Sequence, residues 1–311
     1  MKRFILKTLL LLLPITVLAV SMEYLLQHIP NDYVYKKNYL DKHSKEIEIL
    51  ILGGSDVYYG INPVYFPQKA FNASHVSQSL DMDFEIFSKY QNNFSNLQVI
   101  ILSISGVRMW GKLEKAPDSW RMKNYALYYG FKTKSLKDHS ELLNNTLLNN
   151  FRRLYEYYFE KKEGVYWSKL GWGTSYRSLG SMQYLEETGK ITALGHTVNI
   201  NSEDSKNVFA ENMQILKEFI DFCNHKNVKL IILTTPTYHS YFENLSKEHL
   251  NKMDKTMNDF VSKYHNCYYL NWNEDPDFTK EDFHDANHLD EAGAKKLSLK
   301  LTSIIDSLKV F

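Results

Sequence analysis

The strongest constraint on the fold is a set of short segments that are apolar at nearly every position and alternate with segments of helical periodicity. The apolar segments are residues 47–52, 70–73, 97–103, 228–236 and 267–271. Strands that are apolar throughout are buried on both faces, and helices between them form the crossovers of a parallel sheet. Helices are expected at 80–92, 205–225, 246–264 and 291–308. The sequence therefore predicts an α/β three-layer αβα sandwich with a five-stranded parallel sheet of flavodoxin-like order.

A glycine pair and a serine follow the first predicted strand. Parallel α/β sheets bind their ligands beyond the carboxyl ends of the strands, and Gly53, Gly54 and Ser55 lie at such an end. Glycines permit a tight turn there, and the Ser55 amide is expected at a helix N-terminus. Ser55 is a candidate nucleophile by this placement, although a serine before a helix is also an ordinary N-cap.

An aspartate and a histidine follow the fifth predicted strand. Of the eleven histidines, His288 alone has an aspartate, Asp285, three positions before it. A carboxylate at this spacing can hold one ring nitrogen while the other accepts a proton from a serine. Two alternatives stay open: a pair that caps the last helix, or a metal site built from His284 and His288 with Asp282 and Asp285. We expect no metal and no cofactor.

Together these segments resemble a known superfamily. The turn at Gly53–Ser55, the order of strands and the terminal Asp285-x-x-His288 are similar to SGNH or GDSL-like esterases, lipases and carbohydrate acyl-modifying enzymes. Residues 52–63 are especially similar to the membrane-anchored bacterial branch linked to cell-surface polysaccharide acyl modification. The resemblance covers residues 47–106 and 228–305. It implies that Ser55 is the nucleophile, His288 the base and Asp285 the residue that orients the base.

The sequence departs from that family in its oxyanion hole. After the second strand a backbone amide near Ser74 or Ser77 could donate, but no asparagine follows the third strand, where Ser105 and Arg108 are the available substitutes. Loss of one such donor costs about 2.7–4 kcal/mol of transition-state stabilisation. The missing asparagine therefore favours an alternative function, a catalytically weak or inactive SGNH-fold scaffold.

The N-terminus predicts a membrane anchor or a signal sequence over residues 1–27. Lys2, Arg3 and Lys7 precede an uncharged segment, residues 8–20, and the positive flank is expected to stay in the cytoplasm. Ala19-Val20-Ser21 is compatible with a cleaved signal peptide, and this alternative stays open. A tether over residues 28–45 and an extracytoplasmic SGNH hydrolase-like domain over residues 46–311 are expected to follow.

A large insertion interrupts that domain. Residues 107–204 separate the third strand from the next core helix and are expected to form a lid or substrate wall near Ser55, with a packing elaboration that contacts no ligand as the open alternative. Its aromatic and basic candidates for acceptor contacts are Trp167, Trp172, Tyr176 and Arg177.

Composition restricts the class of partner. Thirty-seven basic residues against thirty-six acidic ones leave no global field for nucleic acid. Cys223 and Cys267 form no metal motif; an exported chain could pair them, but two buried free thiols are the favoured expectation. A nucleotide-binding flavodoxin-like protein is disfavoured because no phosphate-cradling glycine pattern continues past Gly54.

The sequence thus predicts an extracytoplasmic serine acyl-ester hydrolase or O-acyltransferase that acts on a cell-envelope glycan. Its expected partners are the acyl ester or glycan, membrane lipid around the N-terminal helix, and the machinery of envelope polysaccharide assembly.

Overall fold

The computed structural model describes residues 1–176 and 185–308 and divides the chain into two compact units. The N-terminal unit comprises Met1–Lys37 and Pro117–Val165, and the sheet unit comprises Asn38–Ala116 and Tyr166–Phe311. Residues 117–165 of the predicted insertion thus belong to the N-terminal unit, whereas the rest of the insertion belongs to the sheet unit.

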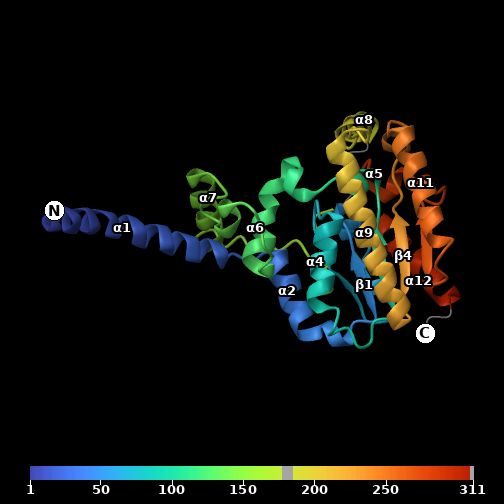
Figure 1. Cartoon of the computed structure of the whole chain (residues 1–311), viewed down its shortest axis with the longest axis horizontal. Coiled ribbons are helices and arrows are strands. Elements are labelled where there is room, and N and C mark those ends of the chain that lie inside the picture. The colour runs from blue at the N-terminus through green and yellow to red at the C-terminus, as the bar shows by residue number, and fades with distance from the viewer. Residues whose placement is uncertain (177–184, 309–311) are drawn as a thin grey trace. The chain divides into compact units, whose positions relative to one another are not determined.

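The sheet unit is built on five parallel strands in the order β2-β1-β3-β4-β5. Figure 1 labels two of them, β1 and β4, between the helices that cover the sheet. The strands are β1 (Ile49–Leu52), β2 (Ala70–Asn72), β3 (Val99–Ser103), β4 (Lys229–Thr234) and β5 (Cys267–Asn271). This order is that of flavodoxin-like folds, whose ligands bind where the strand order reverses, between β1 and β3. The predicted fold class is confirmed.

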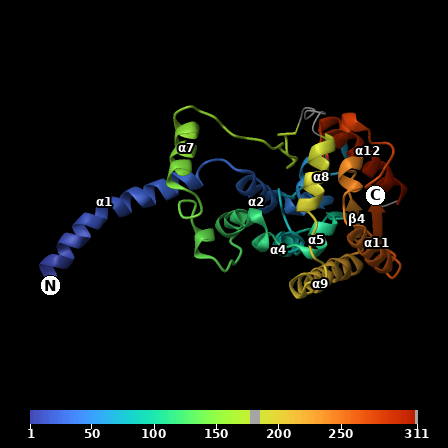
Figure 2. The ribbon, with the colours of Figure 1, turned by 90° about the horizontal axis from the view of Figure 1, so that it is seen from above.

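Helices cover both faces of the sheet, with α12 on one side and α9 on the other (Figure 2). On the first side, α3 (Ser55–Gly60) and α12 (Glu291–Ser307) join a buried apolar cluster with alternate strand residues such as Ile49 and Ile51. On the second side lie α4 (Leu80–Tyr90) and α9 (Glu203–Lys226), joined by the rings of Phe87 and Phe219 at 4.9 Å between centroids. The two-residue side-chain period of a strand explains why each strand supplies both faces.

Further helices and a hairpin complete the sheet unit. They are α5 (Gly106–Trp110), α8 (Leu185–Gly195), α10 (His239–Phe242), α11 (Lys247–Val261) and a hairpin of β6 (Phe283–Asp285) and β7 (His288–Leu289). The Ser240 hydroxyl donates to the Leu185 carbonyl at 2.6 Å and thereby joins α10 to α8. The sequence indicates α11, but neither α8 nor α10.

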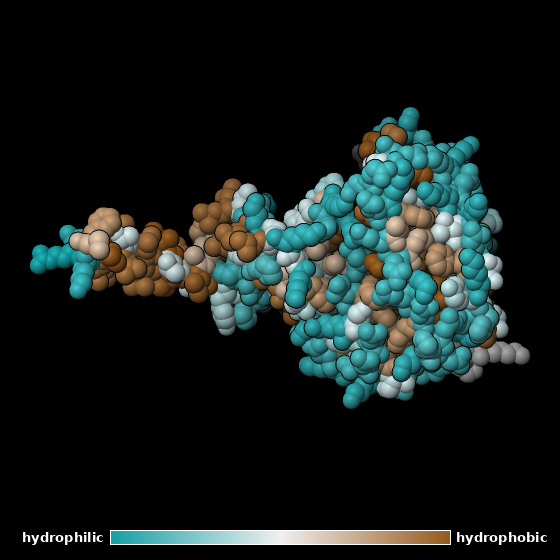
Figure 3. Space-filling view, viewed as in Figure 1, coloured by the Kyte–Doolittle hydropathy of each residue, from teal (hydrophilic) through white to brown (hydrophobic). Residues whose placement is uncertain are grey.

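In the N-terminal unit, α1 (Lys2–Gln27) is the candidate for a membrane span. It has 26 residues, a mean hydropathy of 2.3 in its most apolar window, and apolar side chains exposed along its length (Figure 3). Only its last turns are packed: Met22 and Leu26 are buried, and Glu23 accepts from the amides of Glu141 and Leu142 at 2.9 Å. Helix α1 is therefore long and apolar enough to anchor the chain.

The remainder of this unit is helical. It contains the first part of α2 (Asp32–His43), which lies within the segment expected to be a tether, and also α6 (Met122–Asn124), a π-helix (Tyr125–Tyr129) and α7 (Leu147–Tyr158). Buried Glu141 is paired with Lys123 and, at 2.7 Å, with Arg153. Although burial acts to raise the pKa of Glu141, these two cations hold it below its ordinary value.

The two cysteines are free and buried. Burial raises the pKa of both thiols, that of Cys267 to about 12. No disulfide joins α9 to β5.

Candidate active site

Ser55 is positioned by the turn between β1 and α3. Gly53 has φ of 151°, and a Cβ atom at this position would lie 2.4 Å from both Ser103 Oγ and Val57 Cγ2. Because only glycine fits, β1 can turn into α3 directly beneath Ser55. The N-cap of α3 is Gly54, so the alternative in which Ser55 is the N-cap is wrong.

Asp285 and His288 are brought together by the β6–β7 hairpin. They face each other in the antiparallel register, and Ala286 and Asn287 form the connection. Directly opposed residues of antiparallel strands have neighbouring side chains. The Asn287 amide donates to Asp285 Oδ1 at 3.0 Å, and His288 Nδ1 lies 2.9 Å from each Asp285 carboxylate oxygen. The predicted loop is thus a strand pair that fixes both side chains.

The hairpin connects to Ser55 through the second ring nitrogen of His288. His288 Nε2 lies 2.8 Å from Ser55 Oγ, and the His288 side chain is 13% exposed. Burial alone would raise the pKa of Asp285, but the hydrogen bond and charge of His288 outweigh it and hold the pKa below its ordinary value. An ionised Asp285 that accepts from Nδ1 leaves Nε2 to accept the Ser55 proton.

The structure supports neither alternative for residues 282–288, the cap of the last helix or the metal site. The cap of α12 is Asp290, whose Oδ1 accepts from the Gly293 amide at 2.9 Å, so the helix-cap alternative is wrong. Asp282 accepts from Lys296 Nζ at 2.5 Å, while His284 stacks on Tyr176. Among the described residues, no group of three or more His, Cys, Asp or Glu could hold a metal ion.

The two candidate oxyanion donors after β2, Ser74 and Ser77, differ in their hydrogen bonds and in their backbone conformation. Ser74 is buried, and its amide donates to Asn72 Oδ1 at 3.1 Å, where its hydroxyl also bonds. Ser77 has φ of 61°, in the left-handed region that serine rarely adopts, within a turn closed by a 3.1 Å hydrogen bond from Gln78 N to His75 O. Of the two candidates, Ser77 is therefore the one held in an unusual backbone conformation, whereas the Ser74 amide already donates to Asn72.

The candidates after β3 serve the structure of the turn. The Arg108 guanidinium is buried and bonds to Asp83 and to Ser103, and the Ser103 hydroxyl lies 3.2 Å from Asp56 Oδ1. Ser105 is the N-cap of α5, and its carbonyl accepts from the Arg108 amide at 3.1 Å. Arg108 therefore bonds directly to β3 and, through the Ser103 hydroxyl, supports Asp56, the residue after Ser55. Its guanidinium charge is paired with Asp83.

An aromatic ring from the insertion lies beside the His288 imidazole. Tyr176 stacks on Tyr59 of α3 at 3.9 Å and on His284 at 3.8 Å, and meets the His288 ring edge-on at 5.5 Å between centroids. Tyr176 is thus one of the insertion residues expected near Ser55, and its ring lies beside the imidazole. Arg177 lies outside the described residues.

The tryptophans of the same segment hold it onto α3. Trp172 is buried, and its indole N–H donates to the Tyr59 carbonyl at 2.6 Å. The Gly173 amide donates to the Tyr58 carbonyl at 2.9 Å, with a backbone approach so close that a Cβ would lie 2.2 Å from the Tyr58 ring. Trp167 pairs with Gly173 in an isolated bridge. Trp167 and Trp172 thus position Tyr176.

A second histidine near this site has no signal in the sequence. His196 Nδ1 lies 2.7 Å from the Tyr241 hydroxyl, and Tyr241 packs in one apolar cluster with Ala193 and with Ala286 of the hairpin turn. Burial and the charge of His288 lower the pKa of His196 below its ordinary value. His196 lies within the insertion, which the family resemblance does not cover, so only the folded structure reveals it.

Comparison with known proteins places the chain in one family. Residues 113–295, more than half of the chain, match the family described as "Protein of unknown function (DUF1574)". The chain belongs to this family. The DUF1574 match contains Asp285, His288 and His196 but begins after Ser55, and the family description names no activity.

No curated protein matches this DUF1574 chain. Among solved structures, it is similar to a Bacteroides fragilis NCTC 9343 protein provisionally assigned as an acylhydrolase, with 7% identity and a TM-score of 0.42 over 90% of this chain and 100% of the other.

Proposed function

We propose that this chain is a membrane-anchored serine acyl-ester hydrolase or O-acyltransferase. Ser55 is the nucleophile, His288 the general base, and Asp285 the carboxylate that orients the imidazole. One observation carries the proposal: a continuous hydrogen-bond chain from Ser55 Oγ to His288 Nε2 at 2.8 Å and from His288 Nδ1 to Asp285 at 2.9 Å. Nucleophile, base and orienting carboxylate in this sequence are the parts that acyl transfer requires.

In the first half-reaction, Ser55 Oγ attacks the ester carbonyl carbon while its proton passes to His288 Nε2. The carbonyl π electrons move to oxygen and form a tetrahedral oxyanion. As it collapses, the ester C–O bond breaks and the leaving alkoxide takes the proton from His288. The products are a neutral alcohol and an acyl ester on Ser55, while Asp285 stabilises the transient imidazolium.

The oxyanion requires hydrogen-bond donors close to Ser55. The Ser55 amide opens α3, where the first N–H groups have no acceptor within the helix. We assign the second donor to the backbone near Ser77, because the Ser74 amide donates to Asn72. No asparagine side chain contributes from the turn after β3, so we expect modest rates.

In the second half-reaction, His288 Nε2 removes a proton from water or from a sugar hydroxyl as that oxygen attacks the acyl carbon. The acyl–Ser55 bond breaks, Ser55 recovers its proton, and the acyl group leaves as a carboxylic acid or as a new sugar ester. The acceptor is expected to be a cell-envelope glycan. Support comes from α1, whose apolar length suits an anchor, and from Lys2, Arg3 and Lys7, which favour a cytoplasmic N-terminus.

The second candidate function is a non-catalytic scaffold in surface polysaccharide assembly. It is favoured by the absence of an asparagine after β3 and by the pairing of Arg108 with Asp83, which leaves that charge committed elsewhere. Under this alternative the hydrogen-bond chain at Ser55 is only structural.

The test is turnover by the full-length protein in detergent. It is incubated with p-nitrophenyl acetate, with and without a neutral oligosaccharide, while nitrophenol release and sugar acetylation are measured. We expect turnover that Ser55→Ala abolishes and that the matched Ser88→Ala variant retains, because the Ser88 hydroxyl has no hydrogen-bond partner among the described residues. Sugar acetylation would identify a transferase, and acetate release alone a hydrolase. If the wild-type protein hydrolyses the ester no faster than Ser55→Ala, the non-catalytic scaffold becomes the supported function.

A further inference from the structure

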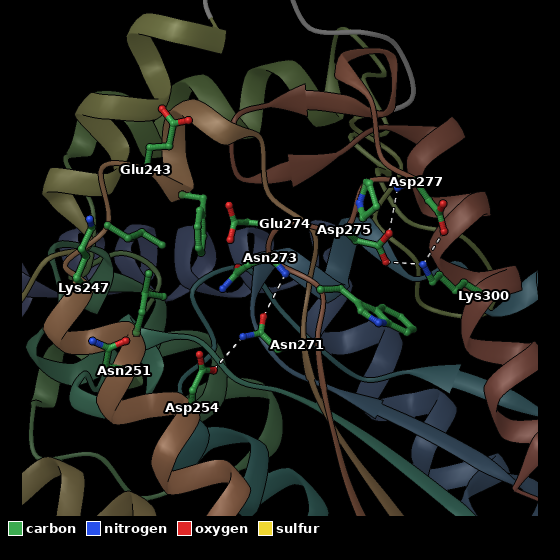
Figure 4. A pocket seen from close by; sticks show the side chains of 15 residues that line it. Glu243, Lys247, Asn251, Asp254, Asn271, Asn273, Glu274, Asp275, Asp277 and Lys300 are labelled. Atoms are coloured by element: carbon green, nitrogen blue, oxygen red, sulfur yellow. Dashed lines mark hydrogen bonds and ion pairs between the residues drawn. The ribbon is translucent and has the colours of Figure 1, made fainter.

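A groove of about 920 Å³ lies beyond the end of β5, between the start of α11 and residues 271–277 (Figure 4). Its lining also includes Phe242 of α10. This volume is within the range of dedicated small-molecule sites. Neither Ser55 nor His288 lines the groove, so the chemistry proposed above does not account for it.

The central feature of the groove is the amide side chain of Asn273. This residue is 5% exposed, and its side chain makes no hydrogen bond within the described part of the chain; only its backbone N–H donates, to Asn271 Oδ1 at 3.2 Å. Figure 4 shows the side chain directed into the groove. The amide oxygen and the two amide N–H donors of Asn273 therefore open into the groove, where they can bind the polar groups of a ligand.

Acceptor oxygens surround that amide. Asp254 Oδ1 accepts from the Tyr269 hydroxyl at 2.7 Å and from Asn271 Nδ2 at 2.9 Å, whereas its Oδ2 has no partner among the described residues. The Glu274 carboxylate lines the same groove without an ion pair to any described residue. Ionised carboxylates only accept, so the ligand must bring donors.

The charges of the lining disfavour an anionic ligand. Lys300 is committed to Asp275 and, at 2.7 Å, to Asp277. The remaining ammonium, that of Lys247, shares the lining with the carboxylates of Asp254, Glu243 and Glu274. A phosphate or carboxylate would therefore meet more repulsion than attraction.

Apolar surface completes the lining. Phe242, Leu250 and Trp272 add apolar side chains to the lining, and the Lys300 ammonium lies 5.3 Å from the centre of the Trp272 ring. A pyranose ring has the matching chemistry: hydroxyls that donate to carboxylates, hydroxyls that both donate to and accept from an amide, and an apolar C–H face that packs on aromatic carbon.

We propose that this groove binds a neutral oligosaccharide, with Asn273 and Asp254 as its principal hydrogen-bonding residues. The proposal does not require that Ser55 be a nucleophile. If both proposals hold, the groove provides a second contact for a glycan chain, because α10 carries Phe242 in the groove and Tyr241 against His196.

The experiment is saturation-transfer difference NMR on the full chain in lauryldimethylamine oxide micelles, since glycosidic detergent heads would occupy a sugar site. The probes are cellohexaose, maltohexaose and chitohexaose. Asn273→Leu removes the buried amide, and Asn251→Ala changes an exposed side chain of the groove without disturbing a buried contact. The control is Asn258→Leu, an exposed position further along α11 outside the groove.

We expect transfer to at least one probe, an affinity at least tenfold weaker in Asn273→Leu, a smaller loss in Asn251→Ala, and wild-type binding in Asn258→Leu. Ser55→Ala should bind as wild type does, which separates this test from that of the acyl chemistry. The proposal is overturned if none of the three probes shows saturation transfer, or if Asn273→Leu and Asn251→Ala bind the sugar equally well. It is also overturned if spermine displaces the sugar, because this would identify a site for cations.

Discussion

Asp285 and His288 face each other across the turn of a β-hairpin, and the His288 imidazole joins the Asp285 carboxylate to the Ser55 hydroxyl. Strand pairing, rather than a flexible loop, therefore sets the distance between carboxylate and imidazole. Residues 233 positions apart, Ser55 and His288, are brought together at the carboxyl end of the sheet.

The first prediction concerns these three residues as a unit. Ser55→Ala and His288→Ala should each lower kcat for p-nitrophenyl acetate by roughly 10⁴-fold or more, and the double variant should be scarcely worse, because the hydroxyl and the base act in the same step. Asp285→Ala should retain more activity than either, since it orients and stabilises the base. Additive losses in the double variant would contradict a shared step.

The second prediction concerns pH and His196. Burial, together with the charge of His288, lowers the pKa of His196, so this imidazole stays neutral where a histidine base operates. His196→Lys places a positive charge there, which disfavours protonation of His288. The base should then stay neutral to lower pH, and the acid limb of kcat/KM should move down by about 0.5–1 pH unit.

His196→Gln, which is neutral, is the control and should leave that limb in place. An acid limb that moves to higher pH in His196→Lys, or does not move at all, would show that His196 is not electrostatically coupled to the base.

The third prediction concerns the turn below Ser55. Gly53→Ala should lower the free energy of unfolding by about 1–3 kcal/mol, because its Cβ would meet Ser103 and Val57 in a backbone conformation unfavourable for alanine. Gly195→Ala, where a Cβ meets nothing within 4 Å, should change it far less. Urea denaturation compares the two variants, and equal midpoints would contradict the steric argument.

The fourth prediction concerns the membrane. Alkaline phosphatase fused after Phe311 should be active in intact cells, and green fluorescent protein fused at the same position should be dark, because Lys2, Arg3 and Lys7 favour a cytoplasmic N-terminus. The fusions should sediment with membranes. Bright fluorescence with inactive phosphatase would reverse the orientation.

Much of the fold could be predicted because the information is local. Continuous apolar runs predict all five strands, and residues 267–271 match β5 to the residue. The run 228–236 extends past β4, which ends at Thr234, because apolar character does not show where pairing stops. Helix α8 and the short α10 cannot be predicted from the sequence, because their stability depends on contacts made only after folding, such as that between Ser240 and Leu185.

The candidate site divides in the same way. Ser55, Asp285 and His288 could be proposed because each stands beside a recognisable strand end, and the structure places their side chains within hydrogen-bonding distance. Arg108 could not be judged from sequence, because its pairing with Asp83 joins α5 to α4. His196 lacked any motif, and its relation to the hairpin depends on Tyr241 and Ala286.

The most direct test of the account is covalent labelling of the folded full-length protein with a serine-reactive fluorophosphonate, followed by peptide mass mapping. We predict a single adduct on Ser55 that is lost in Ser55→Ala and much slowed in His288→Ala, because the base activates the hydroxyl. Circular dichroism establishes that each protein is folded. Absence of an adduct at Ser55 in folded wild-type protein would contradict the nucleophile assignment and leave the scaffold as the function.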